Sequence, residues 1–406
     1  LKFDKNGTCI WSAFVDVRAQ DYAAIAQTVN NENGKIAVDS NENVYLTQSF
    51  SVSSGPNSGL LLYFGQISQS IGGPNSVHTV ITAKINHNGT WDWVAADSEV
   101  RSEKPTSITI DKQSNLWTAY RSGSIDSFTI SKFNRTGDLQ LSSSFTSGQY
   151  VEPYDLDSDT QGNIYLTGLF SEYIPFTLKN GTVETLYCGG CSSAFVMKFD
   201  PSGDILWVTQ ARSSTSSSYA YNIELASDDE ILIVGSFYSG MDFNGSILNA
   251  GGNDNGFIAK INSSGSWQWG EEIECSCEVK ALGLDIDSSG NIYVSGYFNN
   301  GAVFFGNGVS ISPAGTSIDG FTAKYDQYGQ PQWAKSFGGS GTDQGSAVSI
   351  DKMTGKLYVL GSLESNVDFG LETIVTRGAS DLFLASMSID YDGDEIADVS
   401  DNDDDN

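Results

Sequence analysis

One β-hairpin pattern occurs six times along this chain of 406 residues, and the repetition limits the folds that the chain can adopt. Each copy has an alternating apolar arm, a polar turn and a second arm rich in apolar and aromatic residues. Period-two alternation around such a turn is typical of a β-hairpin. These copies, which we call the a–b hairpins, cover residues 36–50, 108–120, 156–170, 223–237, 284–298 and 348–362.

A second hairpin pattern alternates with the first and also occurs six times. Its turn reads Asp/Asn-x-x-Gly, and a large residue follows four positions after the glycine. The Asx side chain hydrogen-bonds the turn backbone, and glycine supplies the positive φ that ends the turn. These copies, the c–d hairpins, cover residues 3–11, 85–93, 133–141, 199–207, 261–269 and 325–333.

Five of the eight tryptophans occupy the same place in the c–d hairpin, and Leu141 occupies it in the remaining copy. An exposed row of aromatic rings could stack on sugars. A residue at the same place in every repeat is more typical of packing between repeats. We therefore predict a structural role for Trp11, Trp93, Trp207, Trp269 and Trp333.

One a–b and one c–d hairpin form a four-stranded unit that cannot bury both of its faces alone, so such units must stack face on face. The sequence therefore predicts an all-β fold, a single β-propeller of about six four-stranded blades over residues 1–389, with seven blades left open. The chain begins with a c–d hairpin and ends with an a–b hairpin and a c-like strand, 381–390. We expect strand 9–15 to close the ring beside 382–389, which leaves the place of residues 1–4 open.

Two segments carry a resemblance to a known family: DSSGNIYVSGYFNNGAVFFG (287–306) and DGFTAKYDQYGQPQW (319–333). They resemble the SBBP-type β-propeller repeat of secreted and cell-surface proteins of bacteria and archaea. The resemblance extends over nearly all of residues 1–390. It implies an extracellular propeller, often beside other modules, and rarely a defined reaction. The second and fourth a–b hairpins depart from the pattern in their glycines.

The chain is strongly acidic, with a formal net charge of −29 at pH 7. Such a surface repels nucleic acid phosphates and anionic lipids, so we exclude both as partners. No apolar run approaches the ~20 residues that a membrane-spanning helix needs. We expect an extracellular or cell-surface location and a protein or glycan partner, with self-assembly between neighbouring chains or modules left open.

Four of the five cysteines form two close pairs, Cys188-Gly-Gly-Cys191 and Cys275-Ser-Cys277. Four thiolates could hold zinc, but the second spacing is unusual for such a site and no histidine lies near it. A disulfide between Cys188 and Cys191 suits an oxidising compartment, and we predict that bond. The oxidation state of Cys275 and Cys277 is left open, and Cys9 has no evident partner.

Residues 390–406 hold nine acidic residues and no Lys or Arg, and we expect them to form an acidic calcium-binding repeat or linker that is cut short. Acids stand at positions 1, 3, 5, 9 and 12 of the window 390–401, the spacing of oxygen ligands in an EF-hand-like calcium loop. The segment also resembles the calcium-binding aspartate repeats of thrombospondin type 3 modules. Glu395 stands where glycine is usual, and a solvated acidic linker is the alternative. The predicted calcium ligands are Asp390, Asp392, Asp394, the Ile396 carbonyl, Asp398 and Asp401.

The sequence offers little material for catalysis. Its two histidines, His78 and His87, are too few for a convincing Ser-His-Asp triad, and it has no zinc-protease, P-loop or dinucleotide motif. Most acids are explained by turn chemistry, among them Asp39, Asp111, Asp159, Asp287 and Asp351 at the a–b turns. We therefore predict no catalytic residue and no enzymatic activity.

The leading hypothesis is a non-enzymatic extracellular or cell-surface propeller that acts as a binding or structural scaffold in adhesion or surface assembly, with a calcium-stiffened C-terminal linker. The alternatives are a carbohydrate-binding, lectin-like propeller and a polysaccharide-active glycosidase or lyase. A lectin should show exposed aromatic rings beside Asn and Asp, and an enzyme one deep pocket with convergent carboxylates. The irregular loops predicted to bind a partner are 51–60, 70–80, 171–191 and 211–220.

Overall fold

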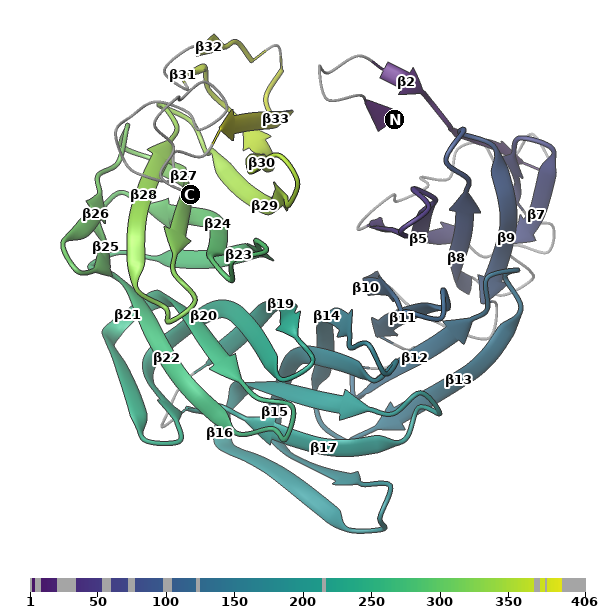
Figure 1. The fold of residues 1–406 in the computed structure, drawn as a ribbon, viewed down its shortest axis with the longest axis horizontal. Coiled ribbons are helices and arrows are strands. Elements are labelled where there is room, and N and C mark those ends of the chain that lie inside the picture. The colour runs from purple at the N-terminus through teal and green to yellow at the C-terminus, as the bar shows by residue number, and fades with distance from the viewer. Residues whose placement is uncertain are drawn as a thin grey trace. The chain divides into compact units, whose positions relative to one another are not determined.

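The structure, a computed structural model, is built from β-strands, and the described residues contain no helix (Figure 1). The described strands form six antiparallel β-propeller blades, five built on four strands and the sixth on three, which confirms the predicted fold class. A membrane-spanning helix is accordingly not found in the described part of the chain. The described residues are 2–3, 9–19, 34–52, 60–71, 77–97, 104–121, 125–213, 217–368, 373–376 and 378–388.

The chain divides into two compact units, Leu1–Thr185 with Met197–Val208, and Leu186–Val196 with Thr209–Asn406. The first unit contains two complete blades and two small sheets. The complete blades are β4 (Lys35–Val38), β5 (Val44–Val52), β8 (Val77–Ile85) and β9 (Trp91–Asp97), and β10 (Lys104–Ile110), β11 (Leu116–Arg121), β12 (Ser127–Phe133) and β13 (Leu139–Thr146). The small sheets are β1 (Lys2–Phe3) with β2 (Cys9–Trp11), and β3 (Val15–Ala19) with β6 (Leu60–Phe64) and β7 (Ile67–Ile71).

A third blade has the middle of its third strand in the second unit. Its strands are β14 (Val151–Ser158), β15 (Ile164–Thr177), β16 (Val183–Phe199) and β17 (Ile205–Gln210). β15 and β16 are 14 and 17 residues long, whereas β12 and β13 of the preceding blade have 7 and 8 residues. The third blade therefore extends beyond the second.

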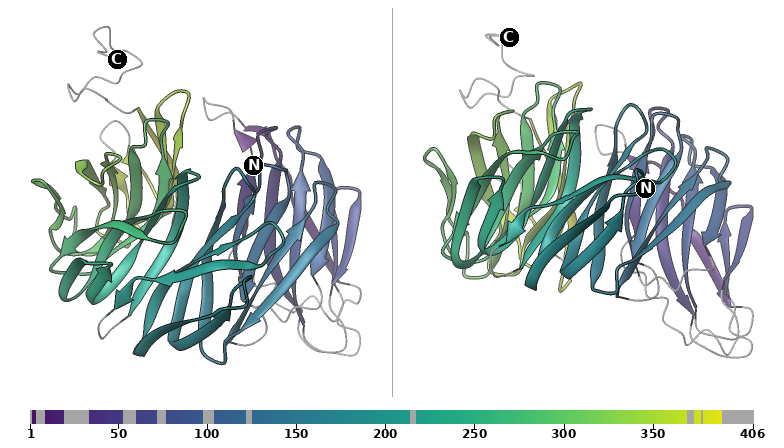
Figure 2. Two further views of the ribbon diagram at one scale, coloured as in Figure 1. Left: turned by 60° about the horizontal axis from the view of Figure 1, so that its bottom comes forward. Right: turned by 90° about the horizontal axis from the view of Figure 1, so that it is seen from below.

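The second unit holds the remaining blades, whose strands lie side by side in Figures 1 and 2. The fourth blade is β19 (Ser218–Ser227), β20 (Glu230–Phe243), β21 (Ser246–Ile261) and β22 (Trp267–Cys275), extended by β18 (Arg212–Ser213), β25 (Val303–Gly306) and β26 (Val309–Ile311). The fifth is β23 (Val279–Ile286), β24 (Ile292–Asn299), β27 (Ile318–Tyr325) and β28 (Pro331–Phe337). The sixth is β29 (Gln344–Asp351), β30 (Lys356–Leu363) and β33 (Asp381–Ser388), with β31 (Val367–Asp368) and β32 (Thr373–Ile374) forming a separate pair.

The hydrophobic core of the second unit lies between successive blades. Val234 and Ile258 of the fourth blade pack in one buried cluster with Val279, Val294 and Phe298 of the fifth. Burial of a Val, Ile or Phe side chain contributes about 1.5–3 kcal/mol, so face-to-face stacking is the main stabilising interaction of the blades.

An aspartate fastens the a–b turn in the way that the sequence predicted. Asp287 accepts the N–H groups of Ser289 at 2.9 Å and Asn291 at 2.8 Å with Oδ1. Its Oδ2 accepts the Asn291 amide at 2.8 Å and the Tyr293 hydroxyl at 3.1 Å. Similar contacts occur at Asp39 and Asp159. These carboxylates are occupied by the turn itself, which explains the recurrent Asp-x-x-x-Asn-x-Tyr without catalysis.

The repeated tryptophan packs against the turn of the following c–d hairpin. A Cβ placed on Gly137 would lie 2.6 Å from Cδ2 of Trp93, so only glycine allows this contact. The Trp93 indole N–H also donates to the carbonyl of Arg135 at 3.1 Å. Trp11 makes the same pair of contacts, with Gly89 and the His87 carbonyl. The prediction that these tryptophans pack between repeats is confirmed at these positions.

Two predictions about the chain ends remain untested. β2 pairs with β1, and β33 pairs with β30. The predicted pairing of strand 9–15 with 382–389 would join the two compact units and stays a prediction. The boundary between 389 and 390 lies outside the described residues, and so do the predicted calcium ligands Asp390, Asp392, Asp394, Ile396, Asp398 and Asp401.

Candidate functional site

A pocket of about 540 Å³ opens in the second compact unit, and tyrosines and charged residues dominate its lining. Protein ligands usually bind in concave sites where apolar rings supply contact area and a few polar groups set orientation. Five strands and one loop contribute to it. The lining residues are Gly190, Cys191, Ser217, Tyr219, Tyr221, Tyr238, Asp254 and Lys280.

A β-bulge in β19 places two of the tyrosines. Ala220 pairs with Gly235 and Asn222 with Val234, so Tyr221 is an extra residue without a partner across the ladder. A bulge bends its strand and redirects the side chain. The rings of Tyr219 and Tyr221 stack, with centroids 5.7 Å apart and planes 9° apart. The result is a double aromatic wall on the innermost strand of the fourth blade.

Tyr238 and Asp254 form another side of the pocket because they face each other across the β20–β21 ladder. Tyr238 is 45% exposed, so part of its ring is available to a ligand. Burial raises the pKa of the Asp254 carboxyl, although Lys280 opposes this shift and Glu278 adds to it. Among the described residues, none donates a hydrogen bond to this carboxyl.

Lys280 enters the pocket from β23, the innermost strand of the fifth blade, and its charge is already compensated. Its Nζ lies 2.7 Å from Oε1 of Glu278 and 5.8 Å from the ring centroid of Tyr297. Tyr297 in turn donates its hydroxyl to Glu278 at 3.3 Å. Burial alone would lower the pKa of Lys280, but the hydrogen bond from Lys280 to Glu278 and the charges around it raise the pKa above its usual value. Lys280 therefore stays protonated and paired with Glu278.

Tyr221 is held in its neutral form. Burial raises the pKa of its hydroxyl to about 12, and that hydroxyl lies 3.2 Å from the Oγ of Ser236. The pocket thus presents a neutral aromatic wall, one compensated ammonium group and one carboxylate without a hydrogen-bond donor.

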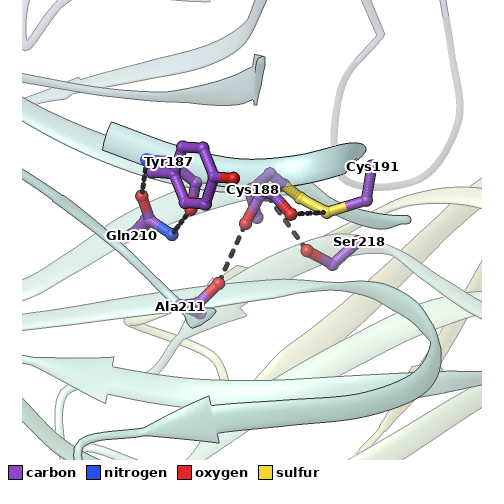
Figure 3. Close-up of a disulfide and its surroundings, with 8 residues drawn as sticks. Tyr187, Cys188, Cys191, Gln210, Ala211 and Ser218 are labelled. Atoms are coloured by element: carbon purple, nitrogen blue, oxygen red, sulfur yellow. Dashed lines mark hydrogen bonds between the residues drawn. A yellow bond between two sulfur atoms is a disulfide. The ribbon is translucent and has the colours of Figure 1, made fainter. Parts of the chain in front are cut away.

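The Cys188–Cys191 disulfide forms one rim of the pocket, which Cys191 lines. Figure 3 shows this disulfide near Gln210 and Ser218. The bond closes a loop in which Gly189 and Gly190 both adopt positive φ, at 65° and 93°. Hydrogen bonds at two places fasten the rim to the end of β17 and to the start of β19. The Tyr187 backbone exchanges hydrogen bonds with the Gln210 side chain at 2.8 and 2.9 Å, and the Ser218 hydroxyl accepts the Ala194 N–H at 3.0 Å. Since Gly190 and Cys191 line the pocket, the disulfide fixes one of its walls.

The structure pairs the cysteines as the sequence led us to expect for Cys188 and Cys191. It also joins Cys275 to Cys277, whose state the sequence left open. Cys9 is free and exposed. Within the described residues, no group of three or more His, Cys, Asp or Glu side chains could hold a metal ion.

Two of the four loops singled out in the sequence reach the pocket. The segment 171–191 supplies Gly190 and Cys191, and 211–220 supplies Ser217 and Tyr219. Much of loops 51–60 and 70–80 lies outside the described residues.

The sequence reasoning missed four lining residues, which come from strands: Tyr221, Tyr238, Asp254 and Lys280. One signal was available, because Tyr-Ala-Tyr (219–221) interrupts the apolar alternation expected at the start of an a–b hairpin.

Comparisons with known proteins give one WD repeat-containing relative but no family. No family model matches the chain. An uncharacterized WD repeat-containing protein of Acanthamoeba polyphaga mimivirus is 24% identical over 433 residues, covering 86% of this chain. The chain spans only 30% of the length of that relative. The resemblances to SBBP-type and thrombospondin type 3-like repeats stay predictions.

Several solved structures are similar in architecture at low identity. An α-L-arabinofuranosidase of Fusarium graminearum is 9% identical, with a TM-score of 0.43, and the match covers 87% of this chain and 93% of that chain. A virginiamycin B lyase of Staphylococcus aureus is 12% identical, with a TM-score of 0.33, covering 86% and 96%. A Synechocystis apocarotenoid oxygenase is 10% identical, with a TM-score of 0.37, covering 83% and 71%.

These comparisons correct one prediction. We predicted from the scarcity of catalytic motifs that the protein is not an enzyme, and this prediction is wrong, because the similar structures include enzymes. A propeller fold is compatible with many functions, and the chemistry of a chain must be argued from its own site. With TM-scores below 0.5, the similarities assign no particular reaction to this chain.

Proposed function

We propose that this chain is a carbohydrate-binding propeller of a secreted or cell-surface protein, and that its ligand occupies the pocket beside the Cys188–Cys191 disulfide. The observation that carries the proposal is that the stacked pair Tyr219 and Tyr221 lines the same pocket as Tyr238 and Asp254. A sugar ring has C–H faces that pack on aromatic rings and hydroxyl groups that donate hydrogen bonds to carboxylates. The pocket offers both kinds of partner.

Two further features support an extracellular role. Both disulfides, Cys188–Cys191 and Cys275–Cys277, are typical of an oxidising compartment. The net charge of −29 keeps such a surface solvated and disfavours nucleic acids and anionic lipids as partners. The neutral, hydroxyl-rich surface of a glycan meets no such repulsion.

A glycan array followed by calorimetric titration tests the proposal. We expect the full chain to bind at least one class of oligosaccharide, and Tyr219→Ala to weaken that binding about 5- to 30-fold, because one ring contact is worth roughly 1–2 kcal/mol. Tyr328→Ala is the matched control, since Tyr328 is 69% exposed and does not line the pocket. The proposal fails if no glycan binds, or if the two variants weaken binding equally.

The second candidate is a scaffold that assembles with neighbouring chains or modules through adhesion-type contacts. Within the described residues, β33 is hydrogen-bonded only to β30. Leu382 and Leu384 on β33 are 85% and 59% exposed, beside Leu360 at 45%. An open edge with apolar side chains can pair with another strand. Sedimentation velocity at increasing protein concentration tests this candidate. If the protein stays a monomer up to about 100 μM, the free energy of association is weaker than about 6 kcal/mol, which is too weak for assembly.

Calcium remains part of both candidates as a proposal. Asp390, Asp392 and Asp394 carry the alternating carboxylates of an oxygen-ligand loop. Titration of calcium into chelator-treated protein should give saturable heat that is lost in the Asp392→Ala plus Asp394→Ala variant. Absence of heat in the unsubstituted chain would make the segment a plain acidic linker and leave the pocket proposal unaffected.

A further inference from the structure

The charge balance of the tyrosine pocket identifies a ligand class more narrowly than its shape does. Lys280 is paired with Glu278 at 2.7 Å, so these two charges compensate each other. Asp254 has no such partner at hydrogen-bond distance among the described residues. The lining residues and Glu278 together therefore carry one net negative charge next to three tyrosine rings.

Tyrosine faces attract cations because the ring quadrupole presents negative charge to them. Recognition of ammonium groups by proteins uses this arrangement, aromatic rings together with a carboxylate. One example involves a lining residue, since the Lys280 ammonium group lies 5.8 Å from the ring centroid of Tyr297. Tyr219 and Tyr238 are the rings available for a second ammonium group, with Asp254 directly across the ladder from Tyr238.

We propose that the ligand of this pocket is a sugar that carries a protonated amine, with the sugar ring against Tyr219 and Tyr238 and the ammonium group on Asp254. This inference rests on the proposed carbohydrate-binding function and adds the chemical class of the sugar. An ammonium group supplies the donors that the Asp254 carboxylate lacks, and a ligand–carboxylate pair in a partly desolvated site is stronger than in water.

An acidic sugar fits the pocket less well. Its carboxylate would have to take Lys280 from Glu278, which holds it at 2.7 Å, and would meet the charge of Asp254. Breaking a partly buried ion pair costs more than the new pair returns when one charge is left unpaired. A neutral N-acetylated sugar would contact the rings but would bring no positive charge to Asp254.

Three oligosaccharides distinguish these cases in calorimetric titrations of the full chain at about pH 6.5, where an amine with a usual pKa near 8 is protonated. The probes are a glucosamine tetramer, its N-acetylated counterpart and a tetramer of uronic acids. We expect the glucosamine tetramer to bind about 10- to 100-fold more tightly than the N-acetylated one.

The Asp254→Asn variant should abolish that preference while it still binds both neutral and amine-bearing tetramers weakly through the tyrosines. Glu274→Gln is the matched control, because Glu274 is exposed on β22 and does not line the pocket. Thermal melting of each variant shows that it is folded.

The outcomes separate this inference from the function on which it rests. The amine assignment would be overturned if the N-acetylated or uronic tetramer binds as tightly as the glucosamine tetramer, or more tightly. Carbohydrate binding in this pocket would still stand if Tyr219→Ala weakens that binding. A preference for the amine that survives in Asp254→Asn would also overturn the assignment. If none of the three tetramers binds, the amine assignment is overturned together with its premise.

Discussion

Two buried aspartates of the second unit should respond in opposite ways to substitution by asparagine: Asp319, near the start of β27, and Asp343, directly before β29. Asp343 accepts four hydrogen bonds. Its Oδ1 accepts the N–H groups of Glu364 at 2.9 Å and Ser365 at 3.3 Å, and its Oδ2 accepts the Gly339 N–H at 2.8 Å and the Ser365 hydroxyl at 2.9 Å. Asp343→Asn replaces one oxygen by an NH₂ group that faces donors, so two charge-assisted hydrogen bonds are lost.

The expected cost follows from these contacts. A hydrogen bond to a charged group contributes about 1.5–3 kcal/mol, so the loss of two costs at least about 3 kcal/mol. For a unit of this size, 1 kcal/mol shifts the melting temperature by about 2–4 °C. Asp343→Asn should therefore lower the melting temperature by about 6–12 °C.

Asp319 lies in the opposite situation. It is fully buried, its Oδ2 accepts the Ala314 N–H at 2.7 Å, and its Oδ1 has no hydrogen-bond partner among the described residues. Burial raises the pKa of this carboxyl, the Ala314 and Gly315 N–H groups oppose the shift, and Asp343 adds to it. Asp319→Asn keeps an acceptor for Ala314 and removes a buried charge, so it should raise the melting temperature at pH 7 by about 2–4 °C, or about 1 kcal/mol.

The pH dependence gives the sharper test. An acid whose pKa is raised in the folded state destabilises the fold above that pKa, and the penalty disappears as the pH falls towards the unfolded value of about 3.9. The gain of Asp319→Asn should thus be present at pH 7 and absent near pH 4. Calorimetric melting of both variants measures it. Equal shifts for Asp319→Asn and Asp343→Asn, or a pH-independent gain, would refute the reasoning.

Three further outcomes are expected. Trp93→Ala should cost about 3–5 kcal/mol and Trp93→Leu clearly less, because Leu141 fills the same place in the next repeat; equal losses in thermal melting would contradict the packing role. Cys188→Ser with Cys191→Ser should destabilise by up to about 2 kcal/mol and weaken glycan binding about 3- to 10-fold in titration, whereas unchanged affinity would remove the disulfide from the site. The Thr354 hydroxyl lowers the pKa of Asp351, so the contribution of that carboxylate to the free energy of unfolding is present above about pH 4 and is lost as the pH falls further. Asp351→Ala should therefore lose less stability below pH 4 than the unsubstituted chain in an acid titration. An unchanged slope of stability against pH would contradict this.

The hairpins and their turns could be predicted because their determinants are local. The contacts of Asp287 with Asn291 and Tyr293 lie within seven residues, and the alternation of each strand is visible in the sequence. The role of Trp93 followed from its recurrence at one place in the repeat, although its glycine partner, Gly137, lies in the next c–d hairpin.

The pocket could not be predicted, because its residues meet only through packing of separate strands. Tyr219 and Lys280 are 61 positions apart and come together because β19 and β23 are neighbouring innermost strands. Tyr221 reaches the pocket through a bulge, and a single extra residue leaves no clear mark on a period-two pattern. The pKa of Asp254 depends on the charged groups around it, and only the three-dimensional structure shows that Lys280 forms its ion pair with Glu278.

A crystal structure of the chain with a saturating glucosamine tetramer tests the central claim most directly. The account predicts electron density for a sugar ring against Tyr219 and Tyr238, with its amine at hydrogen-bond distance from Asp254. Sugar density that lies elsewhere, or a tyrosine pocket left empty at saturation, would contradict it.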